Sequence, residues 1–252
     1  MSEQNFAAAQ YTPRAADYVT SAVHAQGPDL DQIEALVTGH AGAVVLDLGC
    51  GGGHVSYRAA PHVARVVAVD VTPAMLEQVR KTAALKGLGN IETRQAPAEE
   101  LPFADAMFDI VLCRFTAHHW QDFAAGLREA RRVLKPGGLA VFIDTVAPAP
   151  RVLDTHLQAM ELLRDASHVR NYSVPEWVAE LARAGFVVQG TTLRRLRMEF
   201  PIWIARTQTP PELAAAIRQL QRGAPEDVRA HFAIGDDGSF DIESAAFVLG
   251  AG

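Results

Sequence analysis

The chain is poor in cysteine and has no excess of positive charge. Its 252 residues include two cysteines, and 23 basic residues stand against 29 acidic ones, for a formal net charge of −6. Cys50 and Cys113 each lie in an apolar context, which is typical of reduced, buried thiols and not of a disulfide framework. Without a global basic field, binding to nucleic acid or to an anionic membrane surface is not expected.

Long apolar runs and metal-ligand clusters are also missing. No stretch approaches the run of about 18 apolar residues that a membrane-spanning helix needs. The N-terminal sequence lacks the basic segment followed by an apolar run that marks a secretory signal. No group of histidines, cysteines and carboxylates has metal-ligand spacing. We therefore expect a cytoplasmic protein with no membrane span and no metal cofactor.

Between about residues 43 and 146, short β-branched runs alternate with helical patterns. Continuous apolar strands separated by helices indicate a parallel sheet that is covered on both faces, with right-handed crossovers. The Lys-Pro-Gly-Gly sequence at 135–138 is expected to stop a helix and form a turn. Strands are predicted at 43–47, 65–70, 90–95, 108–113 and 139–143, and helices at 54–61, 73–86 and 122–134.

The pattern changes on both sides of this region. Residues 13–39 are predicted to form one or two helices that cap the carboxyl edge of the sheet. The later part is expected to contain helices at 151–168 and 175–184, a strand from 184 towards 200, helices within 201–232, and a last strand at 239–249. The chain is thus expected to be one domain, 1–252, made of an N-terminal cap 1–40, a ligand-binding core 41–147, and a C-terminal part 148–252 with a helical insert 201–232.

The sharpest motif is the sequence Val-Leu-Asp-Leu-Gly-Cys-Gly-Gly-Gly at residues 45–53. It leads a predicted strand into Gly49, Gly51 and Gly53, and then into a helix. Glycines allow the backbone to turn sharply and let a ligand approach main-chain N–H groups without a Cβ in the way. Because open α/β sheets bind ligands beyond the carboxyl ends of their strands, this loop is a candidate binding site.

The loop departs from the dinucleotide pattern Gly-x-Gly-x-x-Gly, since His54 stands where the third glycine would fall. Asp47 ends the predicted strand two residues before the first glycine. A carboxylate there would repel a pyrophosphate but suits a ligand with an ammonium or sulfonium. Asp70 closes the second predicted strand, where a carboxylate can accept hydrogen bonds from both ribose hydroxyls of a nucleoside. The motif therefore favours a positively charged nucleoside.

Together these features resemble the class I, seven-stranded S-adenosylmethionine-dependent methyltransferases, and most closely their small-molecule branch, which includes the ubiquinone and menaquinone C-methyltransferases. The resemblance implies a doubly wound α/β fold with a mostly parallel sheet in the order 3-2-1-4-5-7-6. Its last strand would be antiparallel, with a helical cap at the N-terminus and a helical insert between strands six and seven. The landmarks lie at residues 45–53, 69–76, 98–103, 108–111 and 132–138.

The resemblance also implies which residues hold S-adenosylmethionine. The three loop glycines would line its methionyl part with Arg114 beside it, and Asp70 would hold the ribose. Pro97 departs from the family, in which Asp or Asn often accepts the adenine amino hydrogen, so backbone groups or Glu99 would take that role. Val71 and Met75 would flank the adenine, with plain core packing as the alternative for Met75. The expected cofactor-binding residues are Asp47, Gly49, Gly51, Gly53, Asp70, Val71, Met75, Ala98, Glu99 and Arg114.

Methyl transfer from a sulfonium requires the protein mainly to align the acceptor and to remove a proton. His118 or His119, just after the fourth predicted strand, is the expected general base, with packing or hydrogen bonding as the alternative role. The stretch 164–172 is expected to form either an acceptor lid facing an anionic or carbonyl group, or a solvated loop. The candidate acceptor-binding residues are Arg164, His168, Arg170, Trp203 and Arg206, together with Tyr18 and its neighbour Tyr11 on the cap.

No Asn-Pro-Pro-Tyr sequence follows the fourth predicted strand, so the resemblance does not extend to methyltransferases of DNA adenine or of glutamine amides. Asp144 follows the fifth predicted strand, where catechol-type relatives bind a metal, but partner carboxylates are not evident. The predicted function is methyl transfer from S-adenosylmethionine to a small-molecule acceptor at carbon, oxygen or nitrogen. The alternatives are a regulatory protein that binds S-adenosylmethionine or S-adenosylhomocysteine without catalysis, and a dinucleotide or nucleotide-sugar enzyme.

Overall fold

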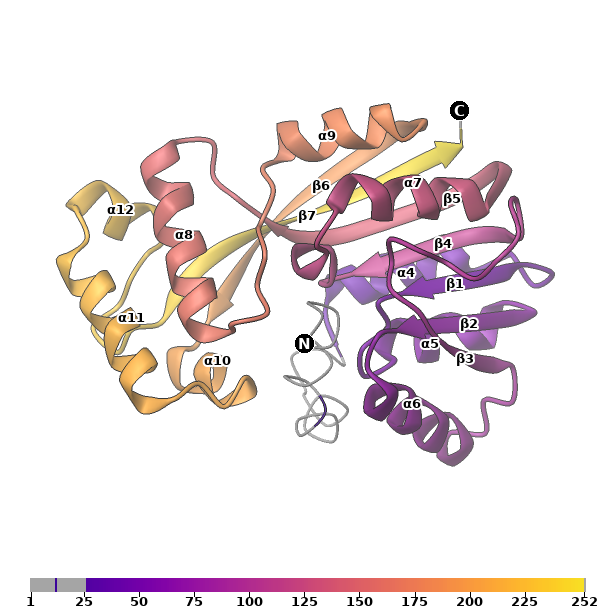
Figure 1. Cartoon of the computed structure of the whole chain (residues 1–252), viewed down its shortest axis with the longest axis horizontal. Helices are drawn as coiled ribbons and strands as arrows, with labels where there is room; N and C mark the ends of the chain where they lie inside the picture. Colours follow the sequence, from indigo (N-terminus) through magenta and orange to yellow (C-terminus); the bar gives the residue numbers. More distant parts are fainter. Residues whose placement is uncertain (1–11, 13–25, 252) are drawn as a thin grey trace.

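A computed structural model describes Thr12 and residues 26–251, in which seven strands form one sheet. The strand order is β3-β2-β1-β4-β5-β7-β6, as the resemblance to the methyltransferases implied (Figure 1). β7 is antiparallel to both of its neighbours, and the other pairs are parallel. The strands are β1 (Val44–Leu48), β2 (Arg65–Asp70), β3 (Ile91–Gln95), β4 (Phe108–Arg114), β5 (Leu134–Val146), β6 (Phe186–Met198) and β7 (Phe240–Ala251).

Helices lie between these strands as the alternating pattern predicts. Among the described residues, no helix is both long and apolar enough to cross a lipid bilayer. The α-helices are α4 (Pro28–Val37), α5 (His54–Ala59), α6 (Pro73–Leu85), α7 (Phe123–Val133), α8 (Arg151–Arg164), α9 (Val174–Arg183), α10 (Phe200–Arg206), α11 (Pro211–Gly223) and α12 (Glu226–His231); two 3₁₀ turns are η2 (Ala60–His62) and η3 (Ala117–His119).

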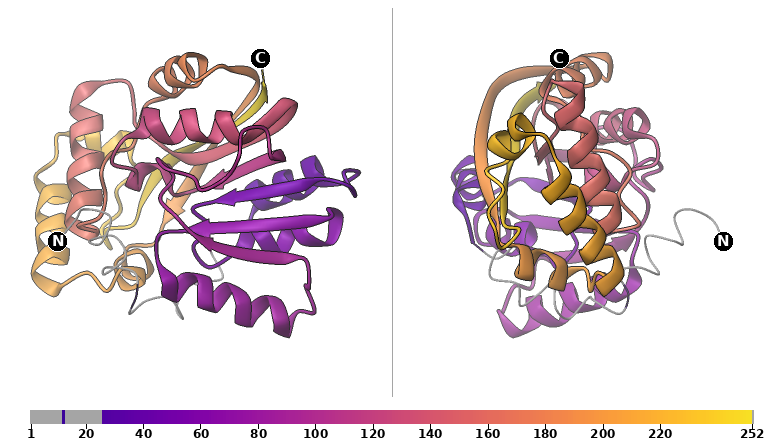
Figure 2. Two further views of the ribbon diagram at one scale, coloured as in Figure 1. Left: turned by 45° about the vertical axis from the view of Figure 1, so that its right-hand side comes forward. Right: turned by 90° about the vertical axis from the view of Figure 1, so that its left-hand side faces the viewer.

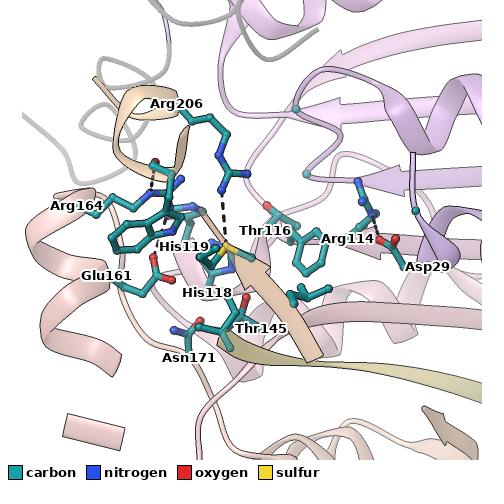
Figure 3. A pocket seen from close by; sticks show the side chains of 18 of the residues that line it. Asp29, Arg114, Thr116, His118, His119, Thr145, Glu161, Arg164, Asn171 and Arg206 are labelled. Carbon is teal, nitrogen blue, oxygen red and sulfur yellow. Dashed lines mark hydrogen bonds and ion pairs between the residues drawn. The ribbon is translucent and has the colours of Figure 1, made fainter. Parts of the chain in front are cut away.

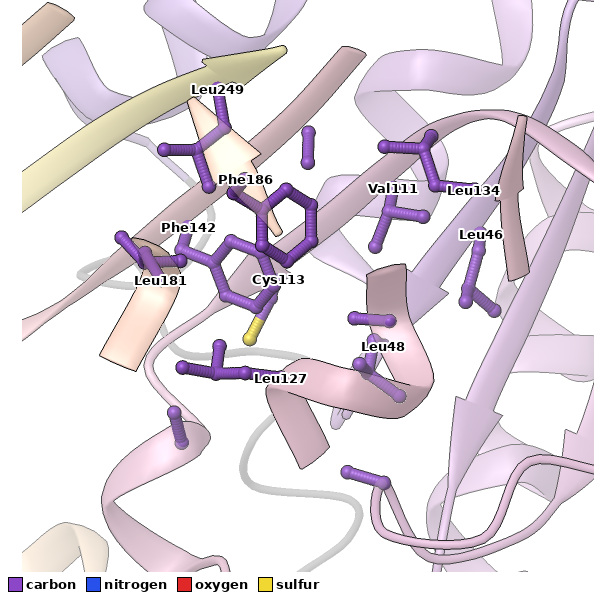
Figure 4. Packing of buried hydrophobic residues seen from close by; sticks show 14 of the residues in the cluster. Leu46, Leu48, Val111, Cys113, Leu127, Leu134, Phe142, Leu181, Phe186 and Leu249 are labelled. Atoms are coloured by element: carbon purple, nitrogen blue, oxygen red, sulfur yellow. The ribbon is translucent and has the colours of Figure 1, made fainter. Parts of the chain in front are cut away.

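Alternate side chains of the central strands bury against helices on opposite faces of the sheet. Leu46 and Val111 point into a cluster with residues of α7 and α9, which Figure 4 shows around Phe142 and Leu127. Val45 and its neighbours on the other strands pack instead against α4 and α5. Because both faces are covered, the strands are apolar throughout, which is the pattern that made them recognisable.

β6 and β7 extend beyond the rest of the sheet into a group of helices at one end of the molecule (Figures 1 and 2). We call this group, formed by α8, α10, α11 and α12, the helical lobe. Its own apolar core includes Trp203, Ile217 and Phe232, packed with Phe240 of β7. Helices α10 to α12 lie between β6 and β7, where the insert was predicted.

The predicted helix stop at residues 135–138 is confirmed, because α7 ends at Val133, but the predicted turn there is wrong. β5 begins at Leu134, immediately after α7, and the ladder with β4 shifts register between Phe108 and Ile110. A Cβ on Gly138 would lie 2.9 Å from the carbonyl oxygen of Asp109. The glycine is therefore needed for the close approach of two strands at an irregular pairing and does not mark the end of regular structure.

Candidate functional site

The glycine loop between β1 and α5 has a backbone that glycine alone adopts without strain. Gly49, Gly51 and Gly53 have φ angles of 68°, 48° and 83°, in the left-handed region. A Cβ on Gly49 would come within 2.3 Å of the hydroxyl oxygen of Thr116, whereas one on Gly51 would meet no atom within 4 Å. The loop thus combines a close internal contact with an open face.

Asp70, at the end of β2, joins the glycine loop to the segment that follows β2 by hydrogen bonds. Its Oδ2 accepts a hydrogen bond from the Gly51 N–H at 2.9 Å, and its Oδ1 accepts one from the Thr72 N–H at 2.8 Å. Burial raises the pKa of Asp70, and these hydrogen bonds partly oppose that effect. Each carboxylate oxygen has a further lone pair with which it can accept a ligand hydroxyl.

A cavity of about 510 Å³ opens beside this loop and reaches the helical lobe. In Figure 3, Arg164 and Glu161 lie on one side of it, Arg114 and Asp29 on the other, and two histidines between them. Of the residues predicted as ligand-binding or catalytic, the lining includes Gly49, Gly51, Asp70, Val71, Met75, Arg114, His118, His119, Arg164, Trp203 and Arg206.

Asp47 and Gly53 do not lie where the sequence analysis expected them, because neither is part of the described lining of the cavity. Asp47 is 1% exposed, and its Oδ2 accepts hydrogen bonds from the backbone N–H and the hydroxyl of Ser56 at 3.0 and 2.6 Å. Burial raises the pKa of Asp47 to about 7. Gly53 begins α5 and lies against the ring of Tyr57. Both residues thus support the glycine loop from the side that faces away from the cavity.

A smaller hollow of about 70 Å³ adjoins the cavity and shares Gly49, Asp70 and Val71 with it. Ala98 and Glu99, which were predicted to lie near an adenine, line this hollow. One carboxylate oxygen of Glu99 accepts hydrogen bonds from the backbone N–H groups of residues 121 and 122, at 2.9 and 3.4 Å. The Glu99 carboxylate is thus held beside the N-terminus of α7.

Arg114 forms an ion pair that the sequence did not suggest. Its Nε donates to Asp29 Oδ2 at 2.5 Å, and the two side chains are 6% and 11% exposed. Asp29 belongs to α4 and stands 85 positions earlier in the chain, so no local pattern joins the two residues. The pair holds the Arg114 guanidinium in position at the edge of the cavity.

The two candidate bases differ in their partners. The Nδ1 of His118 lies 2.6 Å from Oδ1 of Asp144, which is buried on β5. Burial lowers the pKa of His118, but the charge of Asp144 and its hydrogen bond outweigh this effect and leave the pKa raised. His119 contacts the carbonyl oxygen of Ser167 at 3.0 Å, and burial lowers its pKa to about 4. His118 is therefore the histidine with a carboxylate partner.

The stretch 164–172 is not a lid of free polar groups. The backbone N–H groups of residues 169 and 170 donate to the carbonyl of His118, so the stretch is docked on η3. Two of its predicted acceptor-binding residues are not part of the described cavity lining. His168 is buried, with its Nε2 2.9 Å from Gln158 Oε1, and Arg170 forms ion pairs with Asp154 and Glu176 at 3.1 and 3.3 Å.

Several lining residues were not predicted. They come from the start of α4, from the loops after β2 and β4, from β5, α8 and β6, and from the loop before α9, and no local motif distinguishes them from surface residues. Tyr11 and Tyr18 lie outside the described residues, among which no cluster of histidine, cysteine and carboxylate groups could hold a metal ion. The unpredicted lining residues with polar or charged side chains are Asp29, Thr72, Thr116, Thr145, Glu161, Asn171, Arg195 and Arg197, with Gln26 at the start of the described part.

Comparison with known proteins agrees with this geometry. The family model described as "Methyltransferase domain" matches residues 46–142. The uncharacterized protein YafE of Escherichia coli (strain K12) is 46% identical over 188 residues, which cover 75% of this chain and 91% of YafE. The ubiquinone biosynthesis O-methyltransferase of Acinetobacter baylyi is 37% identical over 123 residues, 48% of this chain and 51% of its own length.

The uncharacterized methyltransferase YcgJ of Bacillus subtilis (strain 168) is similar over most of its length. It is 35% identical over 224 residues, which cover 89% of this chain and 88% of YcgJ. The crystal structure of YcgJ superposes with a TM-score of 0.84 over 88% of this chain and 97% of that one. With the sheet order, the glycine loop and the strand-end acid in place, the chain belongs to the S-adenosylmethionine-dependent methyltransferases.

Proposed function

We propose that this enzyme transfers the methyl group to a small-molecule acceptor, at carbon, oxygen or nitrogen, inside the cavity between the glycine loop and the helical lobe. The observation that carries the proposal is the continuity of that cavity, because Gly51 and Asp70 at one end and Arg164 and Trp203 at the other line the same space. A donor and an acceptor can therefore meet in it. Its volume lies in the usual range for small-molecule sites, about 300–1,000 Å³.

The cofactor end offers the groups that S-adenosylmethionine needs. A Cβ on Gly51 would point into open space, so the loop leaves room for a ligand against its backbone. We assign the ribose to Asp70, the methionyl part to Gly49, Gly51 and Arg114, and the adenine to the region of Val71, Met75, Ala98 and Glu99. When bound, the cofactor supplies a methyl group that its sulfonium already activates.

We assign the general base to His118. Its Nδ1 faces the Asp144 carboxylate, which fixes the proton on that nitrogen and leaves Nε2 with a lone pair for an acceptor proton. The raised pKa keeps this imidazole basic, whereas His119, with a pKa of about 4, is a weaker base near neutral pH. In this proposal Asp144 positions the ring and His118 receives the proton.

The resemblance of half the chain to a ubiquinone biosynthesis O-methyltransferase supports a small organic acceptor. The test is the release of S-adenosylhomocysteine from purified enzyme and S-adenosylmethionine, with and without phenols, amines and carbon acids. We expect at least one of these classes to accelerate release, and transfer RNA or duplex DNA to have no effect. Acceleration by a nucleic acid alone would contradict the proposal.

A further inference from the structure

The lobe side of the cavity carries an excess of positive charge. The charged residues in its described lining there are Arg164 of α8, Arg195 and Arg197 of β6, Arg206 of α10, and Glu161 of α8. The whole chain has a net charge of −6. A local excess of arginine in an acidic protein favours a ligand of the opposite charge at that place.

Nearby carboxylates reduce this excess on β6. Asp241, which is not part of the described lining, lies 2.7 Å from Arg195 Nε and 2.9 Å from Arg197 Nη1. Asp237 is a second carboxylate close to Arg197, whose charge adds to the effect of the Ser239 hydrogen bonds in lowering the pKa of Asp237. Both arginines of β6 thus have carboxylates beside them, and the guanidinium of Arg164 is the better candidate to meet an anion.

Arg164 is held in a fixed position within this group. Its Nε donates to the carbonyl of Trp203 at 3.0 Å, and its guanidinium lies over the Trp203 ring at 4.9 Å. Its Nη1 is 3.4 Å from a Glu161 oxygen, and the side chain is 13% exposed. Its Nη2 makes no hydrogen bond to the described part of the chain. A largely buried guanidinium with a remaining donor is suited to bind a carboxylate.

The opposite end of the cavity has the complementary charge. Asp29 and Asp70 line it with Arg114, and Asp70 is the residue that we assign to the ribose of the cofactor. At the arginine end, the wall also includes the apolar side chains of Leu196, Met198 and Ile242, which belong to or pack against the core of the lobe. The cavity is thus polarised along its length, with an apolar stretch beside the arginines.

We propose that the methyl acceptor is a carboxylate-bearing small molecule with an apolar or aromatic body, and that Arg164 binds its carboxylate. The inference rests on the proposed function, because it names the chemistry of the acceptor in the same cavity. Arg206 of α10 lines the same side of the cavity.

The test compares acids with their neutral amides on enzyme saturated with S-adenosylhomocysteine. Suitable pairs are 3,4-dihydroxybenzoate, 3-phenylpropanoate and octanoate, each with its amide, measured by melting shift and by isothermal titration. We expect at least one acid to bind about tenfold more tightly than its amide, because a charge-assisted hydrogen bond replaces a neutral one. The preference should weaken as salt is added. Equal binding of acid and amide in all three pairs would overturn the inference.

Variants test whether Arg164 is the residue that causes the preference for acids over amides. Arg164→Gln should remove the preference for the acid while S-adenosylhomocysteine affinity stays unchanged, and Arg164→Lys should retain part of it. Arg183→Gln is the matched control, because Arg183 is 71% exposed, pairs with Glu180 and does not line the cavity. If Arg164→Gln does not fold, Arg206→Gln takes its place and should weaken acid binding. A preference that persists in the folded variant would contradict the inference.

The first titration separates the two proposals. Failure of the wild-type enzyme to bind S-adenosylhomocysteine would contradict the cofactor site assigned under the proposed function. Binding of S-adenosylhomocysteine without any preference for the acids would contradict only the anionic acceptor.

Discussion

At the scale of single residues, the two strand-end acids have different surroundings. Asp70 lines the cavity, while Asp47 is turned away from it and accepts hydrogen bonds from Ser56 at the start of α5. Asp70 is the last residue of β2, whereas Asp47 lies within β1 and pairs in register with Ala68, two positions before Asp70. Asp47 therefore lies deeper in the sheet, where donors of Ser56 reach it.

Asp47→Asn should change how the stability of the protein depends on pH. The pKa of Asp47 is about 7 in the folded protein against 3.8 for an ordinary aspartate. Between these values folded Asp47 holds more protons than unfolded Asp47, so the contribution of this residue to the free energy of unfolding falls as pH rises from about 4 to 7. The amide cannot ionise, and its oxygen still accepts from Ser56. Relative to wild type, the variant should gain up to about 1.4 kcal/mol per pH unit over this range.

Urea unfolding of both proteins at several pH values between 4.5 and 8 checks this expectation. Other titrating groups are common to the two proteins, so the difference between their free energies isolates Asp47. Curves that remain parallel across the range would show that the carboxyl titrates normally.

Asp70→Ala should weaken S-adenosylmethionine binding by at least about tenfold, because a charge-assisted hydrogen bond contributes about 1.5–3 kcal/mol. The substitution also frees the Gly51 and Thr72 N–H groups, so the fold is checked by thermal melting. Glu92→Ala, a change of an exposed carboxylate on β3, is the control. Isothermal titration measures the affinities. Unchanged affinity in Asp70→Ala would exclude the ribose role.

At the scale of elements, the position of the proposed base depends on how η3 is held against β5. His118 contacts Asp144 through its ring, and its backbone carbonyl accepts from residues 169 and 170, before α9. The turn is therefore fixed by a buried strand on one side and by the 164–172 stretch on the other. This arrangement makes the stretch a support for the base, with Arg164 at its start reaching the cavity.

The pH dependence of kcat/KM should report His118. A base acts unprotonated, so kcat/KM should rise with pH through the raised pKa of this histidine. Asp144→Asn removes the charge that raises the pKa, and should therefore move the rise to lower pH and reduce the rate. His118→Ala should reduce kcat by about 10²–10⁴-fold. His119→Ala is the comparison, and loss of the rise in that variant alone would assign the base to His119.

At the scale of the whole molecule, a seven-stranded sheet and a helical lobe share two strands. β6 and β7 belong to the sheet at one end and pack through Met198 and Phe240 into the lobe core at the other. The cavity lies between the two regions, with Asp29 and Asp70 on the sheet side and most of its arginines on the lobe side. A ligand that spans the cavity should contact both the sheet and the lobe and so stabilise them together.

S-adenosylhomocysteine should raise the melting temperature of the intact chain. At about 100 times its dissociation constant, a ligand stabilises the folded state by about 2.7 kcal/mol. For a chain of this length that corresponds to a shift of about 5–10 °C. NAD at the same concentration should give no shift, because His54 replaces the third glycine of a dinucleotide loop. A larger shift with NAD would contradict the family-based assignment of the ligand.

The sequence by itself determined the sheet and the position of the loop. Strand and helix periods are local properties, and the apolar strands at 44–48 and 108–114 are recognisable because both of their faces are buried. Glycines with left-handed backbones at Gly49 and Gly51 are likewise a local requirement. In a parallel sheet all carboxyl ends meet at one edge, so Asp70 and His118 were predictable members of the same site.

Only the tertiary structure decided which side chains complete that site. Asp29 reaches Arg114 across 85 positions, and Arg195 and Arg197 join Glu161 only because β6 runs into the lobe. The direction of the Asp47 side chain was set by donors on α5, and the irregular start of β5 by its pairing with β4. These contacts depend on packing between elements distant in sequence, and no periodic pattern along a single segment encodes them.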